Sequence, residues 1–108
     1  MNNTYIGRLG DDPTLRYSNN GNAWCGVGLA IEVRKKVDDE RVSLPIWCDL
    51  KVFGVLAEQM AACTSKGSSL IVVGELQPTE YTNKAGEVVK GFELLAQEVG
   101  INLRWGLK

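Results

Sequence analysis

The chain has 108 residues and carries 12 lysines and arginines, 13 aspartates and glutamates, and no histidine. Such a length fits one compact domain and leaves no room for a second. Because histidine is missing, Ser-His-Asp and Cys-His catalysis, HExxH zinc sites and Cys₂His₂ fingers are excluded. The formal net charge of −1 argues against a simple basic patch for nucleic acid.

The sequence carries no sign of export or membrane insertion. Residues 1–5 are polar, and no basic segment precedes an apolar run, so no secretory signal is expected. The longest purely aliphatic run, residues 70–73, is far shorter than the ~20 residues that span a bilayer. We therefore expect a soluble, cytoplasmic protein with no membrane partner.

The three cysteines, Cys25, Cys48 and Cys63, are too far apart for a CxxC metal or redox motif. Their odd number also argues against a complete disulfide framework. We interpret them as buried, reduced thiols that pack as small hydrophobic groups. The alternatives are a reactive thiol, or one bridge if a pair lies within about 7 Å between Cα atoms.

Apolar and polar residues alternate along most of the chain, which predicts half-buried β-strands. A helical spacing of apolar residues replaces the alternation only in residues 55–65. The charged segment 34–43 is predicted to be a loop that forms the solvated tip of a hairpin, and Pro78 is expected to interrupt the strand that contains it. The expected strands are residues 3–9, 15–17 (a short extended return), 23–33, 46–53, 70–81 and 88 to about 103.

This order places one short helix between the third and fourth strands of a five-stranded antiparallel set. Such an order describes an all-β OB-fold barrel, with residues 1–108 forming a single domain. Mixed parity after Leu94 predicts either a β-bulge in the last strand or burial on both of its faces.

The strand at residues 46–53 indicates where a binding surface lies. Its even positions are all apolar and are predicted to face the core, whereas turning its rings inward would also turn Lys51 inward. Tyr81 likewise falls on a polar face of its strand. The inward set is Ile46, Cys48, Leu50 and Val52, and the outward set is Trp47, Asp49, Lys51 and Phe53.

Several blocks of the sequence form a motif in collinear order. Residues 6–17, IGRLGDDPTLRY, contain G-x-L-x-x-D-P-x-x-R-Y, and residues 47–58, WCDLKVFGVLAE, contain W-x5-F-G-x-L-A-E. The triplet KGS at residues 66–68 is followed by VGEL at 73–76. The smaller matches are Gly21, Leu29-Ala30, Tyr81-Thr82 and Gly86.

These blocks resemble bacterial-type single-stranded DNA-binding proteins over essentially the whole chain. The resemblance implies sequence-independent binding and protection of single-stranded DNA during replication, recombination or repair. It further implies a homotetramer, with a dimer as the alternative, a nucleoid-associated location, no cofactor or metal, and no enzymatic activity. The acidic clusters at residues 11–12 and 38–40 are the only candidate metal ligands, and a turn and a solvated loop explain them.

The resemblance and the strand parity agree on the aromatic rings that would stack on bases, namely Trp47, Phe53 and Tyr81. Burial in a subunit interface is the alternative for these rings. Arg16 is expected to form an ion pair or hydrogen bond near Asp11 or Asp12, with a phosphate contact as its alternative. Trp24 also falls off the core face, and it is expected in an interface or in barrel packing. The expected phosphate contacts, each with an ordinary surface residue as its alternative, are Lys51, Arg34, Lys35, Lys36, Arg8, Lys84 and Lys90.

The chain departs from the family pattern in three places. It has Arg34-Lys35-Lys36 where the family often has an aromatic residue, and residues 77–80, QPTE, where basic residues are common. It also ends without an acidic tail, so tail-mediated recruitment of repair enzymes is not expected. These departures leave an alternative function, a tail-less OB-fold primosomal or replication accessory that acts mainly through protein–protein contacts.

The balanced charge also predicts how DNA is bound. Acidic residues fall in turns, in the helix and in the charged segment, whereas Lys51 shares its face with Trp47 and Phe53. We therefore expect binding to depend more on stacking than on phosphate neutralisation. The salt dependence should then be shallower than that of a strongly basic groove.

Overall fold

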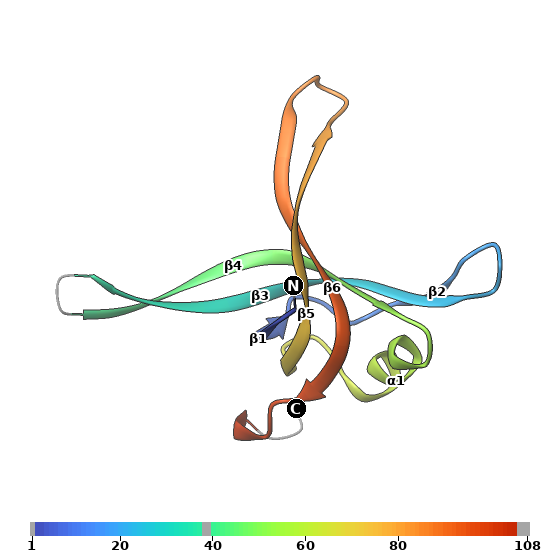
Figure 1. Ribbon diagram of the computed structural model, residues 1–108, viewed down its shortest axis with the longest axis horizontal. Helices are drawn as coiled ribbons and strands as arrows, with labels where there is room; N and C mark the ends of the chain where they lie inside the picture. The colour runs from blue at the N-terminus through green and yellow to red at the C-terminus, as the bar shows by residue number, and fades with distance from the viewer. Residues whose placement is uncertain (1, 38–39, 106–108) are drawn as a thin grey trace.

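The computed structural model describes residues 2–37 and 40–105, and the side chains of residues 33–44 and 105 are outside this description. Strands dominate the fold, as the alternating sequence predicts (Figure 1). In chain order the elements are β1 (Asn3–Leu9), β2 (Leu15–Tyr17), β3 (Ala23–Val37), β4 (Glu40–Phe53), α1 (Val55–Cys63), β5 (Ser69–Thr82), β6 (Val88–Ile101) and a short 3-10 helix (Leu103–Trp105).

Five of the strands close into a ring. The hydrogen-bonded order is β1-β5-β6-β4-β3, and β3 returns to β1, while β2 pairs with β3 outside the ring. The pairings are antiparallel except between β4 and β6, which run parallel over residues 49–51. This topology, with α1 between β4 and β5, confirms the predicted OB-type fold and adds one parallel closure to the antiparallel set.

The core fills the ring with the inward-facing residues of its strands. Leu50 and Val52 are fully buried and Cys48 is 5% exposed, as their parity predicts. Helix α1 contributes Ala57 and Met60 to this core. Among the described residues, the other large side chains that are fully buried are Cys25, Leu29, Leu70, Val72 and Leu94.

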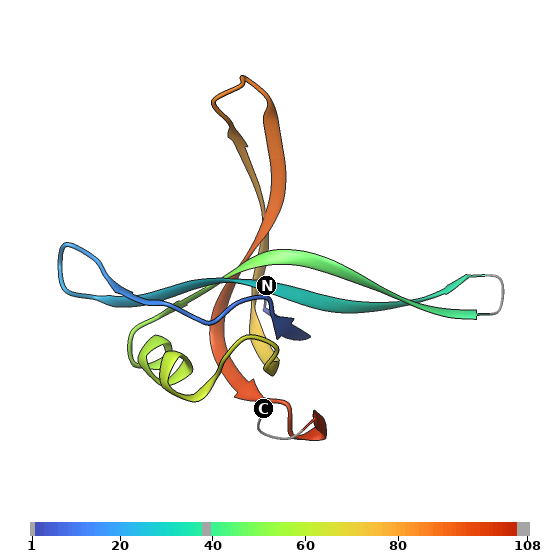
Figure 2. The same cartoon turned by 180° about the vertical axis from the view of Figure 1, so that it is seen from behind.

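Three hairpins extend away from the ring in different directions, formed by β2–β3, β3–β4 and β5–β6 (Figures 1 and 2). The radius of gyration is 15.0 Å, against about 13 Å for a compact chain of this length. The prediction of a loop at residues 34–43 is wrong, because β3 and β4 remain paired as far as Val37 and Glu40. Residues 38–39 lie outside the described residues.

The hairpin geometry also overturns the predicted burial of Ile46, which is 41% exposed. Strand β4 pairs with β6 over residues 49–51. Ile46 therefore lies where the β3–β4 hairpin leaves the ring, and no third strand covers its inward-facing side. Alternation gives the side of the strand on which a residue lies, but burial also needs a neighbour on that side.

Strand β5 passes through Pro78 without interruption, contrary to the prediction, and Pro78 pairs with Phe92 of β6. Past Gly74, β5 is bonded to β6 alone, so the missing N–H of proline is tolerated on the open edge. A register shift between Val73 and Gly74 leaves Gln97 of β6 with no residue opposite it on β5. This irregularity confirms the bulge, one of the two alternatives predicted for the last strand.

Helix α1 ends two residues earlier than predicted, which places Cys63 on its exposed end. The prediction that all three cysteines are buried is therefore wrong for Cys63. The helix begins directly after Gly54, whose φ of 73° suits glycine and whose N–H donates to the Ala23 carbonyl at 2.8 Å. Within the described residues, no helix is long and apolar enough to cross a membrane.

Candidate nucleic-acid interface

The residues of β4 that point away from the core form one surface with their partners on β3. We call this surface the outer face. Trp47 and Phe53 are 59% and 58% exposed on it, as their strand parity predicts. In register across the two strands, the pairs are Trp47 with Ala30, Asp49 with Gly28, Lys51 with Gly26, and Phe53 with Trp24.

Glycines make room for the rings on the outer face. A Cβ atom at Gly10 would lie 2.6 Å from Cζ3 of Trp47, and one at Gly28 would lie 3.7 Å from the same atom. A Cβ atom at Gly26 would lie 3.2 Å from Cζ3 of Trp24. Atoms of both indole rings therefore lie close to backbone that carries no side chain, and much of the Trp47 ring is open to solvent.

Trp24 is on the same outer face, where it is half-buried. The guanidinium carbon of Arg16 lies 5.7 Å from the centroid of the Trp24 ring, and Nζ of Lys51 lies 5.1 Å from it. Both distances fall within the range of cation–π contacts. Arg16 thus contacts Trp24, and not Asp11 or Asp12 as predicted, because β2 pairs Arg16 directly with Trp24.

The sequence places Trp24 off the core face but does not predict that Arg16 meets it there. The signal was present in β3, where Trp24 shares its parity with Gly26, Gly28 and Ala30. Three small residues in a row on one side of a strand indicate that something large lies over it.

Two shallow depressions run along the outer face and share Gly28 and Asp49. One, of about 320 Å³, extends toward β2 between Trp24 and Lys51. The other, of about 240 Å³, extends from Trp47 to the β5–β6 hairpin and includes Tyr81, which is 61% exposed. Trp47 and Tyr81 thus line the same depression.

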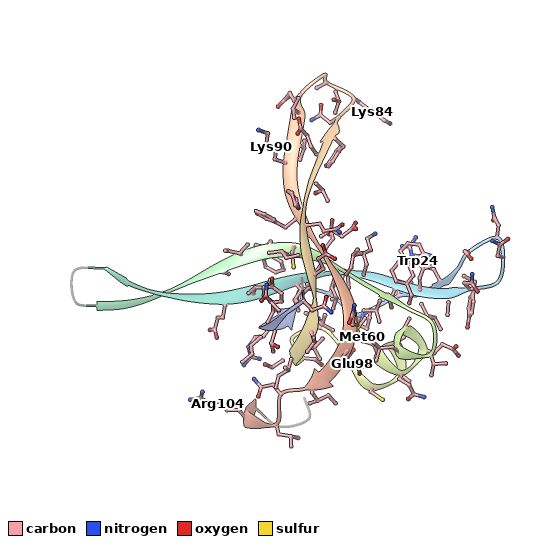
Figure 3. All side chains as sticks on the ribbon, in the orientation of Figure 1. Trp24, Met60, Lys84, Lys90, Glu98 and Arg104 are labelled. Atoms are coloured by element: carbon pink, nitrogen blue, oxygen red, sulfur yellow. The ribbon has the colours of Figure 1, made fainter. Side chains whose placement is uncertain are left out.

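The other predicted phosphate contacts are more dispersed. Arg8 donates to the carbonyl oxygen of Gly67 at 3.1 Å. Lys84 lies in the turn of the β5–β6 hairpin, and Lys90 lies on the side of that hairpin opposite to Lys84 (Figure 3). Because Lys90 pairs with Glu80, it alternates with the residues that share the face of Tyr81. The backbones of Arg34, Lys35 and Lys36 belong to β3, but their side chains lie outside the described residues.

The outer face carries charges of both signs. Asp49 pairs in register with Glu93 of β6, beside the cations of Arg16 and Lys51. Beneath it, burial and then the adjacent Asp49 carboxylate raise the pKa of the Cys48 thiol to about 11. In the part of the chain that the structure describes, no group of three or more histidine, cysteine or acidic residues could hold a metal ion.

A ring of strands that exposes aromatic rings beside cations is the arrangement of an OB-type module for single-stranded nucleic acid. Comparison with known proteins places the chain within that class. Residues 1–102 match the model of the single-strand binding protein family. The chain belongs to this family, which confirms the resemblance found in the sequence.

Two relatives and one solved structure illustrate the match. A single-stranded DNA-binding protein of Neisseria meningitidis serogroup A is 32% identical over 95 residues, covering 87% of this chain but 55% of that protein. Single-stranded DNA-binding protein 2 of Clostridium acetobutylicum is 38% identical over 110 residues, covering 98% of this chain and 79% of that protein. The chain therefore spans little more than half of the Neisseria relative.

The crystal structure of a small single-stranded DNA-binding protein from Streptomyces coelicolor superposes with a TM-score of 0.84 at 18% identity. The match covers 98% of this chain and 97% of that one. At this level of identity, the likeness supports the fold alone.

Proposed function

We propose that this protein binds single-stranded DNA without sequence preference and protects it during replication, recombination or repair. The observation that carries the proposal is the pair of exposed rings, Trp47 and Phe53, with Lys51 between them on the outer face. Every base has a face that can stack on such a ring, and stacking contributes about 1–3 kcal/mol per base. Duplex DNA keeps its bases stacked inside the helix, so single strands are the fitting ligand.

Family membership supports strand binding over the alternative of an accessory that acts through protein contacts. The proposal includes no catalytic step, since nothing in base stacking or phosphate contact needs one. Such a protein acts where DNA is unwound, so the proposal places it in the cytoplasm, at the nucleoid.

The proposal also includes assembly into a homotetramer, as the family resemblance implies. Ile6 and Ile71 pair in register on β1 and β5, and they are 47% and 36% exposed. Exposed apolar side chains that adjoin one another support self-association. Light scattering with and without a dT oligonucleotide tests this part, and a monomer under both conditions would contradict it.

The test of binding is the fluorescence anisotropy of a labelled dT oligonucleotide titrated with the protein and its variants. Trp47→Ala and Phe53→Ala should each raise Kd by roughly fivefold to 150-fold, which corresponds to the loss of one stacked base. Tyr81→Ala should also weaken binding. Tyr17→Ala is its matched control, because both tyrosines are 61% exposed but Tyr17 pairs with Ala23, away from the outer face. Trp47 and Phe53 variants that bind like the wild type would refute the proposal.

A further inference from the structure

We propose that Arg16, Trp24 and Lys51 form a phosphate-binding subsite for the DNA strand, in which the Trp24 ring holds the two cations. The inference rests on the proposed function and extends the DNA path from β4 onto the β2–β3 hairpin. It gives Trp24 a positioning role, distinct from the base stacking proposed for Trp47 and Phe53.

The first observation is the geometry around a single ring. The Arg16 guanidinium carbon and the Lys51 Nζ lie 5.7 Å and 5.1 Å from the Trp24 centroid. Arg16 arrives from β2, where it is the register partner of Trp24. Lys51 arrives from β4, two residues before Phe53, the other register partner of Trp24. Two cations from different strands thus converge on one indole.

The second observation concerns the charges of Arg16 and Lys51, which contact the Trp24 ring but are not neutralised by an ion pair among the described residues. Among the described residues, neither Arg16 nor Lys51 forms an ion pair, although Asp49 lines the same depression. Two cations that contact one ring without forming an ion pair repel each other, and a bound anion relieves this repulsion. The site is therefore suited to an anion, and it is open, because Arg16 is exposed and the depression of about 320 Å³ lies beside it.

The third observation is the position of the subsite relative to the stacking rings. Lys51 lies two residues from Phe53 on the same face of β4, a separation of about 7 Å. A base that stacks on Phe53 thus brings a backbone phosphate within reach of the subsite. Gly26 keeps this approach open, since its missing side chain would lie 3.2 Å from the Trp24 ring and 3.4 Å from Lys51 Nζ. The ligand is accordingly a phosphodiester of the bound strand.

The test measures Kd for a dT oligonucleotide as a function of salt for Arg16→Met and Trp24→Leu. Each phosphate contact on a single strand contributes about 0.7 to the slope of log K against log salt. Arg16→Met should therefore lower the slope by about 0.7 and weaken binding about fivefold near 0.1 M salt. Arg104→Met is the matched control, because it removes the same charge at an exposed site remote from the β2–β3 hairpin (Figure 3).

The role of Trp24 is separated from stacking by a second oligonucleotide with neutral methylphosphonate linkages. Trp24→Leu should weaken binding to normal dT but leave binding to the neutral strand unchanged, since no phosphate charge remains to be held. A variant that combines Arg16→Met with Trp24→Leu should bind normal dT about as weakly as Trp24→Leu alone, because the Trp24 ring and the Arg16 cation act together. Thermal melts establish that Trp24→Leu is folded, and the exposed Arg16→Met tests the subsite in any case.

The outcomes distinguish this subsite from the proposed function. If the wild type binds dT but Arg16→Met keeps its affinity and slope, the subsite is refuted and strand binding stands. If Trp24→Leu loses affinity equally for the neutral strand, Trp24 stacks on a base and the positioning role is refuted. If the wild type does not bind dT, the proposed function itself fails.

Discussion

Replacing Gly10 with alanine should weaken DNA binding while leaving the fold intact. Gly10 lies outside strands β3 and β4, but it contacts the Trp47 ring of the outer face. The new Cβ would lie 2.6 Å from Cζ3 and 2.9 Å from Cη2 of Trp47. Carbon atoms in contact prefer about 3.5–4.0 Å, so the edge of the ring must move by about 1 Å. A torsional change well below 30° achieves this, at a cost below about 1 kcal/mol.

The cost in binding should exceed the cost in stability. A displaced ring retains part of the ~1–3 kcal/mol that stacking on one base contributes. We expect Gly10→Ala to raise the Kd for a dT oligonucleotide by roughly twofold to tenfold. Gly28→Ala should change binding less, because its Cβ would lie at an ordinary contact distance of 3.7 Å from the same ring.

A double-mutant cycle tests whether the effect passes through Trp47. Anisotropy titrations would compare the wild type, Gly10→Ala, Trp47→Ala and the double variant. If Gly10 acts by seating the ring, its substitution has no effect once Trp47 is alanine. An equal loss of affinity in both backgrounds would refute this reasoning, as would a Gly10→Ala protein that binds like the wild type.

Three further predictions concern the ring of strands and its thiols. Gly74→Ala should lower the melting temperature sharply or prevent folding, because its Cβ would overlap the backbone carbonyl of Leu95. Gly100→Ala is the control: its Cβ would have nothing within 4 Å, so this variant should melt like the wild type. Equal melting temperatures for the two variants would contradict this prediction. A thiol reagent should modify only Cys63 in the native protein and all three cysteines after denaturation, and rapid native labelling of Cys25 or Cys48 would show the burial to be wrong. Because the pKa of Cys48 is raised from 9.0 to about 11, the neutral thiol contributes its full stability below pH 9 and loses it as the pH rises toward 11. The stability difference between the wild type and Cys48→Ala, measured by urea unfolding, should therefore be constant below pH 9 and shrink above it; a constant difference up to pH 11 would argue against the shift.

Strand alternation was sufficient to predict the part of the site that lies within one strand. Trp47 and Phe53 are separated from the core by parity, and the polar neighbour Lys51 fixes which side faces out. Both rings are exposed in the structure as predicted. The same argument holds for Tyr81, which shares its face of β5 with polar residues and is 61% exposed.

Contacts between strands were beyond the reach of periodicity. Arg16 meets Trp24 because of the register between β2 and β3, and this register is set by the turn at residues 18–22. A pattern along one strand carries no information on which residue lies opposite. The expected partners, Asp11 and Asp12, are near Arg16 in sequence, and nearness in sequence does not determine which side chains meet.

The lengths of the hairpins were missed for a related reason. A charged segment satisfies its backbone hydrogen bonds equally well in a loop or in a two-stranded hairpin in water. Strand β3 continues to Val37 because β4 pairs with it residue by residue. The exposure of Ile46 follows from the same extension, because Ile46 lies in the part of β4 that extends beyond the ring.

The most direct test of the central claim, that single strands bind by stacking on the outer face, is a tryptophan fluorescence titration with a dT oligonucleotide at several salt concentrations. Stacking on Trp47 should quench the fluorescence, and the slope of log K against log salt should stay below about 3, the value for about four phosphate contacts on a single strand. A slope above about 5, or binding without quenching, would show that phosphate neutralisation holds the strand and would contradict the account.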